Sequence, residues 1–333
     1  MRLSEMLMNR REVVTMGGAA LGLAGLRRSR AQEAYPARPI TLVVPSAPAG
    51  VHDVIGRAWA ERARFRLGTI VVDNRPGAGG LIATTEAAHA KPDGYTLLIG
   101  STTTQVLITP ALAKPPYDPF RDFVTIAAFA TSSTSIVVTP SLPVTTLAEF
   151  IAYAKANPGK LSFGSAANGS ITHLTGELFK KLAGGLDIVH VPYKGIGPAM
   201  NDLISGHIAM LAPNLTGQAL PLSEAGKIRG LAVNAPARLV VAPQVPTSAE
   251  AGLPDMISQT TFAICAPAGL PKPIVDQLAE TIREMMADQE FQQQLMRLGF
   301  EPLVGYGPEE SERLFREQTA RWVPIIRAVG PIN

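Results

Sequence analysis

The feature that most constrains the fold is a unit of strand, small-residue loop and helix that recurs along the chain. The first copy runs from the β-branched stretch Ile40 to Val44, through the loop Ser46 to Gly50, into a helix. A second starts at Ile70 to Val72, and a third strand, Tyr95 to Ile99, ends in a run of hydroxyl residues. Successive units of this kind predict a parallel sheet covered by helices, with ligands beyond the carboxyl ends of the strands.

A second series of strands and helices follows between residues 160 and 233. The strands Ile126 to Phe129 and Ser135 to Thr139 lead into it, and a strand near Thr261 to Ala266 leads out of it into amphipathic helices. The pattern predicts an α/β fold with two lobes, each a mainly parallel sheet flanked by helices, and a hinge between them. The predicted lobes are residues 32–137 plus 259–333 and residues 138–258.

Residues 1–31 have the composition of an export leader. Arg10 and Arg11 precede an apolar run from Val13 to Leu26, and small residues around Ala31 suit cleavage there. Paired arginines before a Gly/Ala-rich segment predict a twin-arginine signal peptide and a periplasmic protein. The apolar run is short for a membrane span, but a retained anchor and a start at Met8 both stay open.

The leader also carries the excess of positive charge. Residues 1–31 hold six of the 30 Lys and Arg residues and two of the 27 Asp and Glu residues, which leaves 24 basic and 25 acidic residues. A near-neutral chain gives no support to nucleic-acid binding and fits a freely diffusing monomer. The single cysteine, Cys265, excludes an internal disulfide and a multi-cysteine metal site.

The stretch Phe163 to Gly185 contains a further strand, loop and helix. Ser170 and its neighbours offer a helix cap, Lys180 and Lys181 lie in the last turn, and glycines follow. A Gly/Ser loop at a helix N-terminus leaves backbone N–H groups free, and the positive end of the helix dipole lies there. The pattern predicts an anion site, although an ordinary strand-to-helix turn has the same signature.

Seven short motifs occur in order along the chain after the leader. They are Tyr35-Pro36-x-x-Pro39-Ile40, Val44-Pro45 with Gly50 and Asp53, Asn74-Arg75-Pro76-Gly77-Ala78-Gly79-Gly80, Pro92-Asp93-Gly94-Tyr95-Thr96-Leu97, Gly164-Ser165 with Gly169-Ser170 and His173-Leu174, Val191-Pro192-Tyr193-Lys194-Gly195, and Pro246-Thr247 before Glu250-Ala251-Gly252. Together they resemble the substrate-binding proteins of tripartite tricarboxylate transporters, the Bug family.

The resemblance implies a two-lobed periplasmic binding protein-like fold of type II that closes around a small carboxylate and delivers it to an integral membrane permease. It implies no enzymatic activity and no cofactor, and it leaves open whether the ligand is a dicarboxylate, an aromatic acid or an amino acid. The ligand-binding residues carried over by position are Ser46, Ala47, Ala49, Gly50, His52, Asp53, Ser101, Thr102, Thr103, Ser165, Ala166, Asn168, Gly169, Ser170, His173, Tyr193 and Asn214.

The first loop departs from the family's usual pattern. Ser46 stands where an aromatic residue is usual, and Ala49 stands where a glycine is usual. Ser46 removes a stacking surface and Ala49 disfavours a positive φ, so the shape of the pocket and the ligand are expected to differ. His52 is also an uncommon residue beside such a pocket.

Several of these residues have simpler explanations. Asp53 lies four residues before Arg57, so a helix-surface ion pair is the alternative to a ligand contact. His173 and Glu177 have the spacing of two metal ligands, but without a further cluster a structural histidine is the better interpretation. The loop Asn74 to Gly80 lacks the Lys-Ser/Thr ending of a P-loop, which favours a packing turn.

Two other functional classes stay open from the sequence. A periplasmic sensor subunit would dock the same closed form on a signalling receptor. A serine hydrolase is disfavoured, because Ser165, Ser170 and His173 have neither a Gly-x-Ser-x-Gly elbow nor an orienting carboxylate. Tyr193 and Lys194 either contact the ligand or only build a turn.

Overall fold

The computed structural model describes residues 35–107, 109, 112, 114–215 and 219–329. The predicted signal peptide, residues 1–31, lies outside them. Residues 1–37 and 38–333 form two separate units. In the first, Tyr35–Ala37 are described, and the Tyr35–Pro36 peptide is cis. The second unit contains every described helix and strand.

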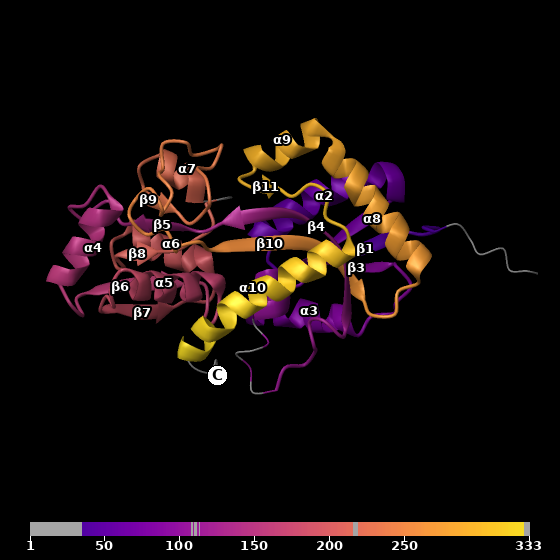
Figure 1. Ribbon diagram of the computed structural model, residues 1–333, viewed down its shortest axis with the longest axis horizontal. Coiled ribbons are helices and arrows are strands. Elements are labelled where there is room, and N and C mark those ends of the chain that lie inside the picture. Colours follow the sequence, from indigo (N-terminus) through magenta and orange to yellow (C-terminus); the bar gives the residue numbers. More distant parts are fainter. Residues whose placement is uncertain (1–34, 108, 110–111, 113, 216–218, 330–333) are drawn as a thin grey trace, which may run out of the picture. The chain divides into compact units, whose positions relative to one another are not determined.

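The first sheet of this unit has six strands among the described residues, in the order β11-β4-β10-β3-β1-β2 (Figure 1). Their bounds are β1 Ile40–Val44, β2 Ile70–Asn74, β3 Thr96–Ser101, β4 Phe123–Ser133, β10 Gln259–Pro267 and β11 Glu301–Pro302. β1 pairs in parallel with β2 and β3. β10 pairs antiparallel with β3 and β4, and β11 pairs antiparallel with β4.

The second sheet has five strands within the described ranges, in the order β7-β6-β8-β5-β9. Their bounds are β5 Ser135–Val138, β6 Leu161–Ser165, β7 Ile188–Pro192, β8 Met210–Leu211 and β9 Arg229–Val233. β6 pairs in parallel with β7 and β8, whereas β5 pairs antiparallel with β8 and β9.

The helices follow the strands as the sequence predicts. Their bounds are α2 Val51–Leu67, α3 Leu81–Ala88, α4 Leu147–Ala156, α5 Ile171–Leu182, α6 Ile196–Ile204, α7 Ala219–Glu224, α8 Lys272–Ala287, α9 Gln289–Arg297 and α10 Pro308–Val329, with a 3-10 turn η1 at Ala78–Gly80 and a π-helical turn η2 at Thr102–Leu107. None of the described helices combines the length and apolar character that a membrane span requires.

The expected two-sheet α/β architecture is confirmed, with a refinement of the pairing. The strands of the repeated strand-helix units, β1 to β3 and β6 to β8, are parallel, because the helices between successive strands, α2, α3, α5 and α6, return the chain to the same edge. The strands that pass from one sheet to the other add antiparallel pairs. Both sheets are therefore mixed.

The two sheets are connected by short crossings. β4 ends at Ser133 in the first sheet, and β5 starts two residues later in the second. At this crossing, Thr134 Oγ1 donates to the carbonyl of Ser258 at 3.1 Å and accepts from Asn234 Nδ2 at 2.8 Å. These three residues are completely or almost completely buried, so the crossing strands share one hydrogen-bonded point.

Helix α10 makes a third connection. Figure 1 shows it passing from β4 in the first sheet toward α5 beside the second, and it contacts both elements. Phe315 of α10 is buried in a core cluster of the first sheet with Val43 and Phe123. Trp322 and Ile326 are buried in a core cluster of the second.

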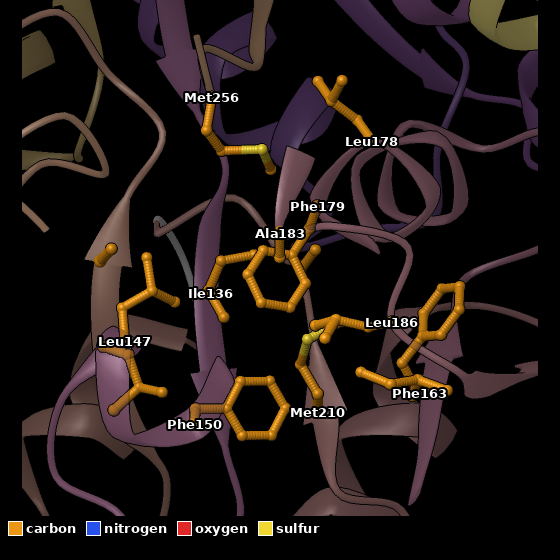
Figure 2. Packing of buried hydrophobic residues seen from close by; sticks show 14 of the residues in the cluster. Ile136, Leu147, Phe150, Phe163, Leu178, Phe179, Ala183, Leu186, Met210 and Met256 are labelled. Atoms are coloured by element: carbon orange, nitrogen blue, oxygen red, sulfur yellow. The ribbon is translucent and has the colours of Figure 1, made fainter. Parts of the chain in front are cut away.

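The core of the second sheet fixes the position of α5. Figure 2 shows part of this cluster, in which Phe150 of α4 and Phe179 of α5 stack with ring centroids 5.9 Å apart. Phe163 of β6 is fully buried beneath the helix. The packing holds the N-terminus of α5 at the carboxyl end of β6, where the predicted site lies.

Candidate ligand-binding site

A pocket of about 1180 Å³ lies between loops that belong to the two sheets. Twelve of the seventeen predicted ligand-binding residues line it: Ser46, Ala47, Ala49, Gly50, His52, Thr103, Ala166, Asn168, Gly169, Ser170, Tyr193 and Asn214. The structure thus brings together loops that are far apart in the sequence, and they meet at the carboxyl ends of the parallel strands.

The other five predicted residues lie behind this surface: Asp53, Ser101, Thr102, Ser165 and His173. Each is buried and bonded to a neighbour that lines the pocket or supports it. Thr102 Oγ1, for example, accepts from the backbone N–H of Thr261 on β10 at 3.1 Å. Their observed contacts hold the loops in place.

Asp53 stabilises the first loop through three hydrogen bonds. Its carboxylate accepts from the backbone N–H of Ala49 at 2.8 Å, from Asn74 Nδ2 at 2.9 Å and from Arg57 Nε at 2.9 Å. Burial alone would raise the pKa of this carboxyl, but the hydrogen bonds from Arg57, Ala49 and Asn74 outweigh it and lower the pKa. The ion pair with Arg57, the simpler alternative from the sequence, is present.

Ala49 has a positive φ of 64° despite its side chain. The sequence-based expectation that alanine disfavours this conformation is correct as a local preference, but the Asp53 carboxylate bonds the Ala49 N–H and holds it. The loop therefore keeps the turn that glycine usually makes.

His52 lies at the second position of α2, 91% buried. Its Nε2 lies 2.9 Å from Ser101 Oγ, and its ring packs edge-on against Phe262 with centroids 5.1 Å apart. Burial lowers the pKa of His52 to about 4, so the imidazole is neutral near pH 7.

The loop between β6 and α5 satisfies many of its own polar groups. Ser170 caps α5 by accepting from the N–H of His173, as predicted. The N–H of Ala166 donates to Thr172 Oγ1 at 2.9 Å, and that of Gly169 donates to His173 Nδ1 at 3.0 Å. This loop therefore has fewer free N–H donors than its composition predicts.

Two stacked histidines, His173 and His190, contact this loop. The rings of His173 and His190 stack with centroids 3.7 Å apart, and His190 Nε2 lies 2.7 Å from Ser165 Oγ. Burial lowers the pKa of His173, and burial together with the charges of His173 and Lys180 lowers that of His190 to about 4. Glu177, the other half of the considered metal pair, accepts from Lys180 at 2.9 Å.

The open helix N-termini belong to α2 and α6. Neither helix has a side-chain cap, and their N-cap residues are Gly50 and Gly195. No described group accepts from the N–H groups of Val51 or His52 in α2 or of Gly197 in α6. Residues 50–52 and 195–197 line the pocket, so two sets of free donors and two positive dipole ends border one space.

The side chains around this space carry little charge. Lys194 is the only Lys or Arg among the described residues that line the pocket, and no Asp or Glu is among them. Much of the wall is apolar: Val51, Leu81, Leu112, Ile171, Ile196, Met200 and Phe262. Nor does any part of the described chain gather three or more His, Cys, Asp or Glu side chains into a potential metal site.

Comparison with known proteins identifies the family. Residues 55–331 match the family model described as "Tripartite tricarboxylate transporter family receptor". The chain belongs to this receptor family. Among relatives, protein BugT of Bordetella pertussis is 33% identical over 325 residues, which are 97% of this chain and 99% of BugT.

Solved structures of similar proteins agree with this assignment. The R. palustris protein Rpa4515, solved with adipate, has a TM-score of 0.82 and 36% identity, covering 90% of this chain and 100% of that one. The periplasmic binding protein BugD has a TM-score of 0.79 and 33% identity, covering 89% and 98%. This receptor therefore has the periplasmic binding protein fold and belongs to a family of binding proteins rather than enzymes.

The receptor's pocket also includes residues that the sequence interpretation did not select. Gly195 to Gly197 follow strand β7 and open helix α6, so the strand-loop-helix pattern used elsewhere would have found them. Ala78 and Gly79 belong to a loop interpreted as a packing turn. Phe262 lies within the crossing strand β10, and no local motif signals its place in the pocket.

Proposed function

We propose that this receptor captures a small carboxylate with an apolar body, a dicarboxylate first of all, in the pocket between its two sheets. The observation that carries the proposal is one pocket bordered by two uncapped helix N-termini and a largely apolar wall. Free N–H donors at helix N-termini suit carboxylate oxygens. The adipate bound to the similar R. palustris protein supports the same ligand class.

An amino acid fits this pocket less well. An ammonium group needs an acceptor, and no Asp or Glu lies among the described lining residues. Asp53, the acceptor considered from the sequence, already bonds Ala49, Arg57 and Asn74. The proposal therefore favours organic acids without a free amine.

The energetics allow useful affinity without many charges. Each hydrogen bond from a backbone N–H to a carboxylate contributes about 1.5 to 3 kcal/mol. Several such bonds reach micromolar affinity, about −8 kcal/mol, after the cost of ordering the ligand and the loops. Contacts from both sheets to one ligand supply the differential affinity that closure requires.

The cellular role follows from the family. We propose that the mature chain starts after Ala31, is exported by the twin-arginine route, and works as a monomer whose lobes, residues 32–137 plus 259–333 and residues 138–258, close on the ligand. The closed form would deliver the acid to the membrane permease of a tripartite transporter. A mature protein of the expected mass in the periplasmic fraction, lost when both Arg10 and Arg11 are changed to Lys, would support this route.

Calorimetric titration of the mature protein tests the ligand class. The panel is succinate, malate, adipate, phthalate, benzoate, aspartate and glutamate, with mass spectrometry of each mixture for products. Saturable binding of a dicarboxylate without product formation supports the proposal. Binding of only the amino acids, or turnover of any compound, overturns it, and a denatured sample is checked for a co-purified acid before a negative result is accepted.

Val51→Pro tests the free donors of α2 specifically. Proline is tolerated at the first position of a helix and removes one N–H, and Gly50 before it has an extended backbone (φ −71°, ψ 165°) that suits a following proline. We expect the dissociation constant for the panel's tightest dicarboxylate to rise about tenfold. Val51→Ala trims the side chain but keeps the N–H, so equal effects of the two variants would contradict an anion site at this helix.

A further inference from the structure

We propose that His52 determines the specificity of this pocket by donating a hydrogen bond from Nδ1 to a carboxylate of the ligand. The inference rests on the proposed function and adds a side chain to the N–H groups of α2.

The two ring nitrogens of His52 have different surroundings. Nε2 is held by Ser101 Oγ at 2.9 Å, with Thr104 Oγ1 at 3.5 Å. Nδ1 has no hydrogen-bond partner among the described residues. In this part of the chain, Trp59 Nε1 is the only fully buried side-chain nitrogen or oxygen that lacks a hydrogen-bond partner, so Nδ1 is not fully buried. Nδ1 therefore reaches accessible space, and His52 borders the pocket.

The hydroxyl groups behind the ring allow the required tautomer. Ser101 Oγ has one proton and two lone pairs. It accepts from the N–H of Thr104 at 3.1 Å and can donate its proton to Nε2. In that arrangement Nδ1 of the neutral imidazole carries the proton and becomes a donor.

The nearby threonines add a second donor. Thr103 Oγ1 and Thr104 Oγ1 both lie 2.9 Å from Ser101 Oγ. Together with the Thr104 N–H and His52 Nε2, these two hydroxyls give Ser101 Oγ four polar neighbours. A hydroxyl group makes at most three hydrogen bonds, so one of the two threonine hydroxyls is not bonded to Ser101. Thr103 and Thr104 both line the pocket, and the spare hydroxyl is available to the same carboxylate.

The surroundings explain the selectivity. An ionised carboxylate only accepts hydrogen bonds, so it selects the tautomer with the proton on Nδ1. An ammonium group only donates, so it requires the other tautomer, in which Nδ1 accepts and Nε2 donates to Ser101 Oγ. Among the described residues, the ring contacts Ser101, Thr104 and Phe262, and none of these is charged. Discrimination at His52 therefore depends on which tautomer the neighbouring hydroxyls favour, and not on net charge.

Three variants separate the two ring nitrogens. His52→Asn keeps an amide donor near the position of Nδ1, whereas His52→Gln keeps a polar group near Nε2 and Ser101, and His52→Ala removes both. With adipate as the probe, or phthalate if adipate is silent, we expect the dissociation constant to rise about 10- to 100-fold for Gln and Ala. The Asn variant should stay within a few-fold of wild type, and His207→Gln, an exposed site, is the control.

Nitrogen NMR of histidine-labelled protein gives a readout that a merely structural role would not move. The five histidines are assigned by single substitution, and saturation with the probe should place the His52 proton on Nδ1. Equal binding by wild type, Gln and Ala, or a bound His52 with its proton on Nε2, overturns the inference while the proposed function stands. If no panel carboxylate binds wild type, the proposed function fails and this inference fails with it.

Discussion

Ala49 is a strained residue in the wall of the pocket. A residue with a side chain at φ 64° loses about 1 to 2 kcal/mol relative to an ordinary conformation. Ala49→Gly removes that strain but gives the unfolded chain more freedom, which costs about 0.4 to 1 kcal/mol. We expect a net gain of up to about 1 kcal/mol in the free energy of unfolding by denaturant titration.

Ala47→Gly is the matched control, because Ala47 is in the same loop and has no positive φ. This variant should lose stability through the entropy of the unfolded chain alone. If both glycine variants lower the free energy of unfolding equally, the proposed strain at Ala49 is absent.

Three histidines, of which His52 and His173 are buried and His190 is partly buried, should make stability depend on pH. The pKa values of His52 and His190 are lowered to about 4 and that of His173 is lowered from 6.5, mainly by burial. A lowered pKa in the folded state means that the unfolded chain takes up protons first as pH falls. The stabilisation is therefore complete above about pH 6.5 and is lost as pH falls toward 4.

Denaturant titrations between about pH 7.5 and about pH 4.5 check this window. His190→Gln should reduce the slope, because it removes one of the three groups and the neighbour of His173. Glu177 and Lys180 also face His173 and stay in place in this variant. His207→Gln, at an exposed site, should leave the slope unchanged, and a flat wild-type profile across the window would refute the prediction.

At the scale of single residues, the sequence predicted which loops line the pocket better than which atoms are free there. Asp53 and Ser165 have the residue types of ligand contacts, but they bond to groups of the protein, which include Asn74 for Asp53 and His190 for Ser165. A local sequence pattern shows that a hydrogen-bond donor or acceptor is present and how far it lies from its neighbours along the chain. Its partner, such as Asn74 for Asp53, comes from another strand and is fixed only by the fold.

Among the elements, α5 depends on close contact with the strand beneath it. A Cβ added at Gly176 would lie 2.3 Å from Phe163 Cε2, far inside van der Waals contact. Gly176→Ala gains about 1 kcal/mol of helix propensity but overpacks the Phe163 ring at a cost of about 1 to 3 kcal/mol. We expect a net loss of unfolding free energy and weaker ligand binding, because the loop before α5 moves with the helix.

Gly197→Ala is the comparison, since no atom lies within 4 Å of a Cβ at Gly197 in α6. It should be neutral or stabilising by helix propensity. If Gly176→Ala is as stable as wild type in thermal unfolding, the packing of α5 on Phe163 leaves room for a side chain at position 176, and the prediction is wrong.

Helices and strands with local sequence signals were predicted well, whereas strand pairings that have no local sequence signal were not. Strand β1 has the predicted bounds, and α5 begins after the predicted cap Ser170. The antiparallel pairs of β4, β5 and β10 were not foreseen, because the strands that cross between sheets have no hairpin turn to indicate their direction.

For the whole molecule, the connections between the two sheets set how far they can move. Thr134 and its buried partners form a short crossing, and α10 adds a longer one with Phe315 in one core and Trp322 in the other. Because α10 is anchored in both cores, it resists motion of one sheet relative to the other unless the helix bends or shifts. Pro324 lies inside α10, two residues after Trp322, and lacks the N–H of a normal helix residue, which makes this turn the natural place for such bending.

Trp322→Ala tests whether α10 holds the two cores in one cooperative unit. Removing this side chain, 1% exposed, should cost about 3 to 5 kcal/mol of unfolding free energy. Because only the second core loses its anchor, calorimetry should resolve two unfolding transitions where wild type has one. Trp59→Ala in α2 removes an equally buried tryptophan that lies outside the clusters bridged by α10, so it should lower stability without splitting the transition. If both variants unfold in one transition of the same shape, α10 adds stability but does not couple the two sheets, and the proposed closure would then depend on the crossing at Thr134 and not on α10.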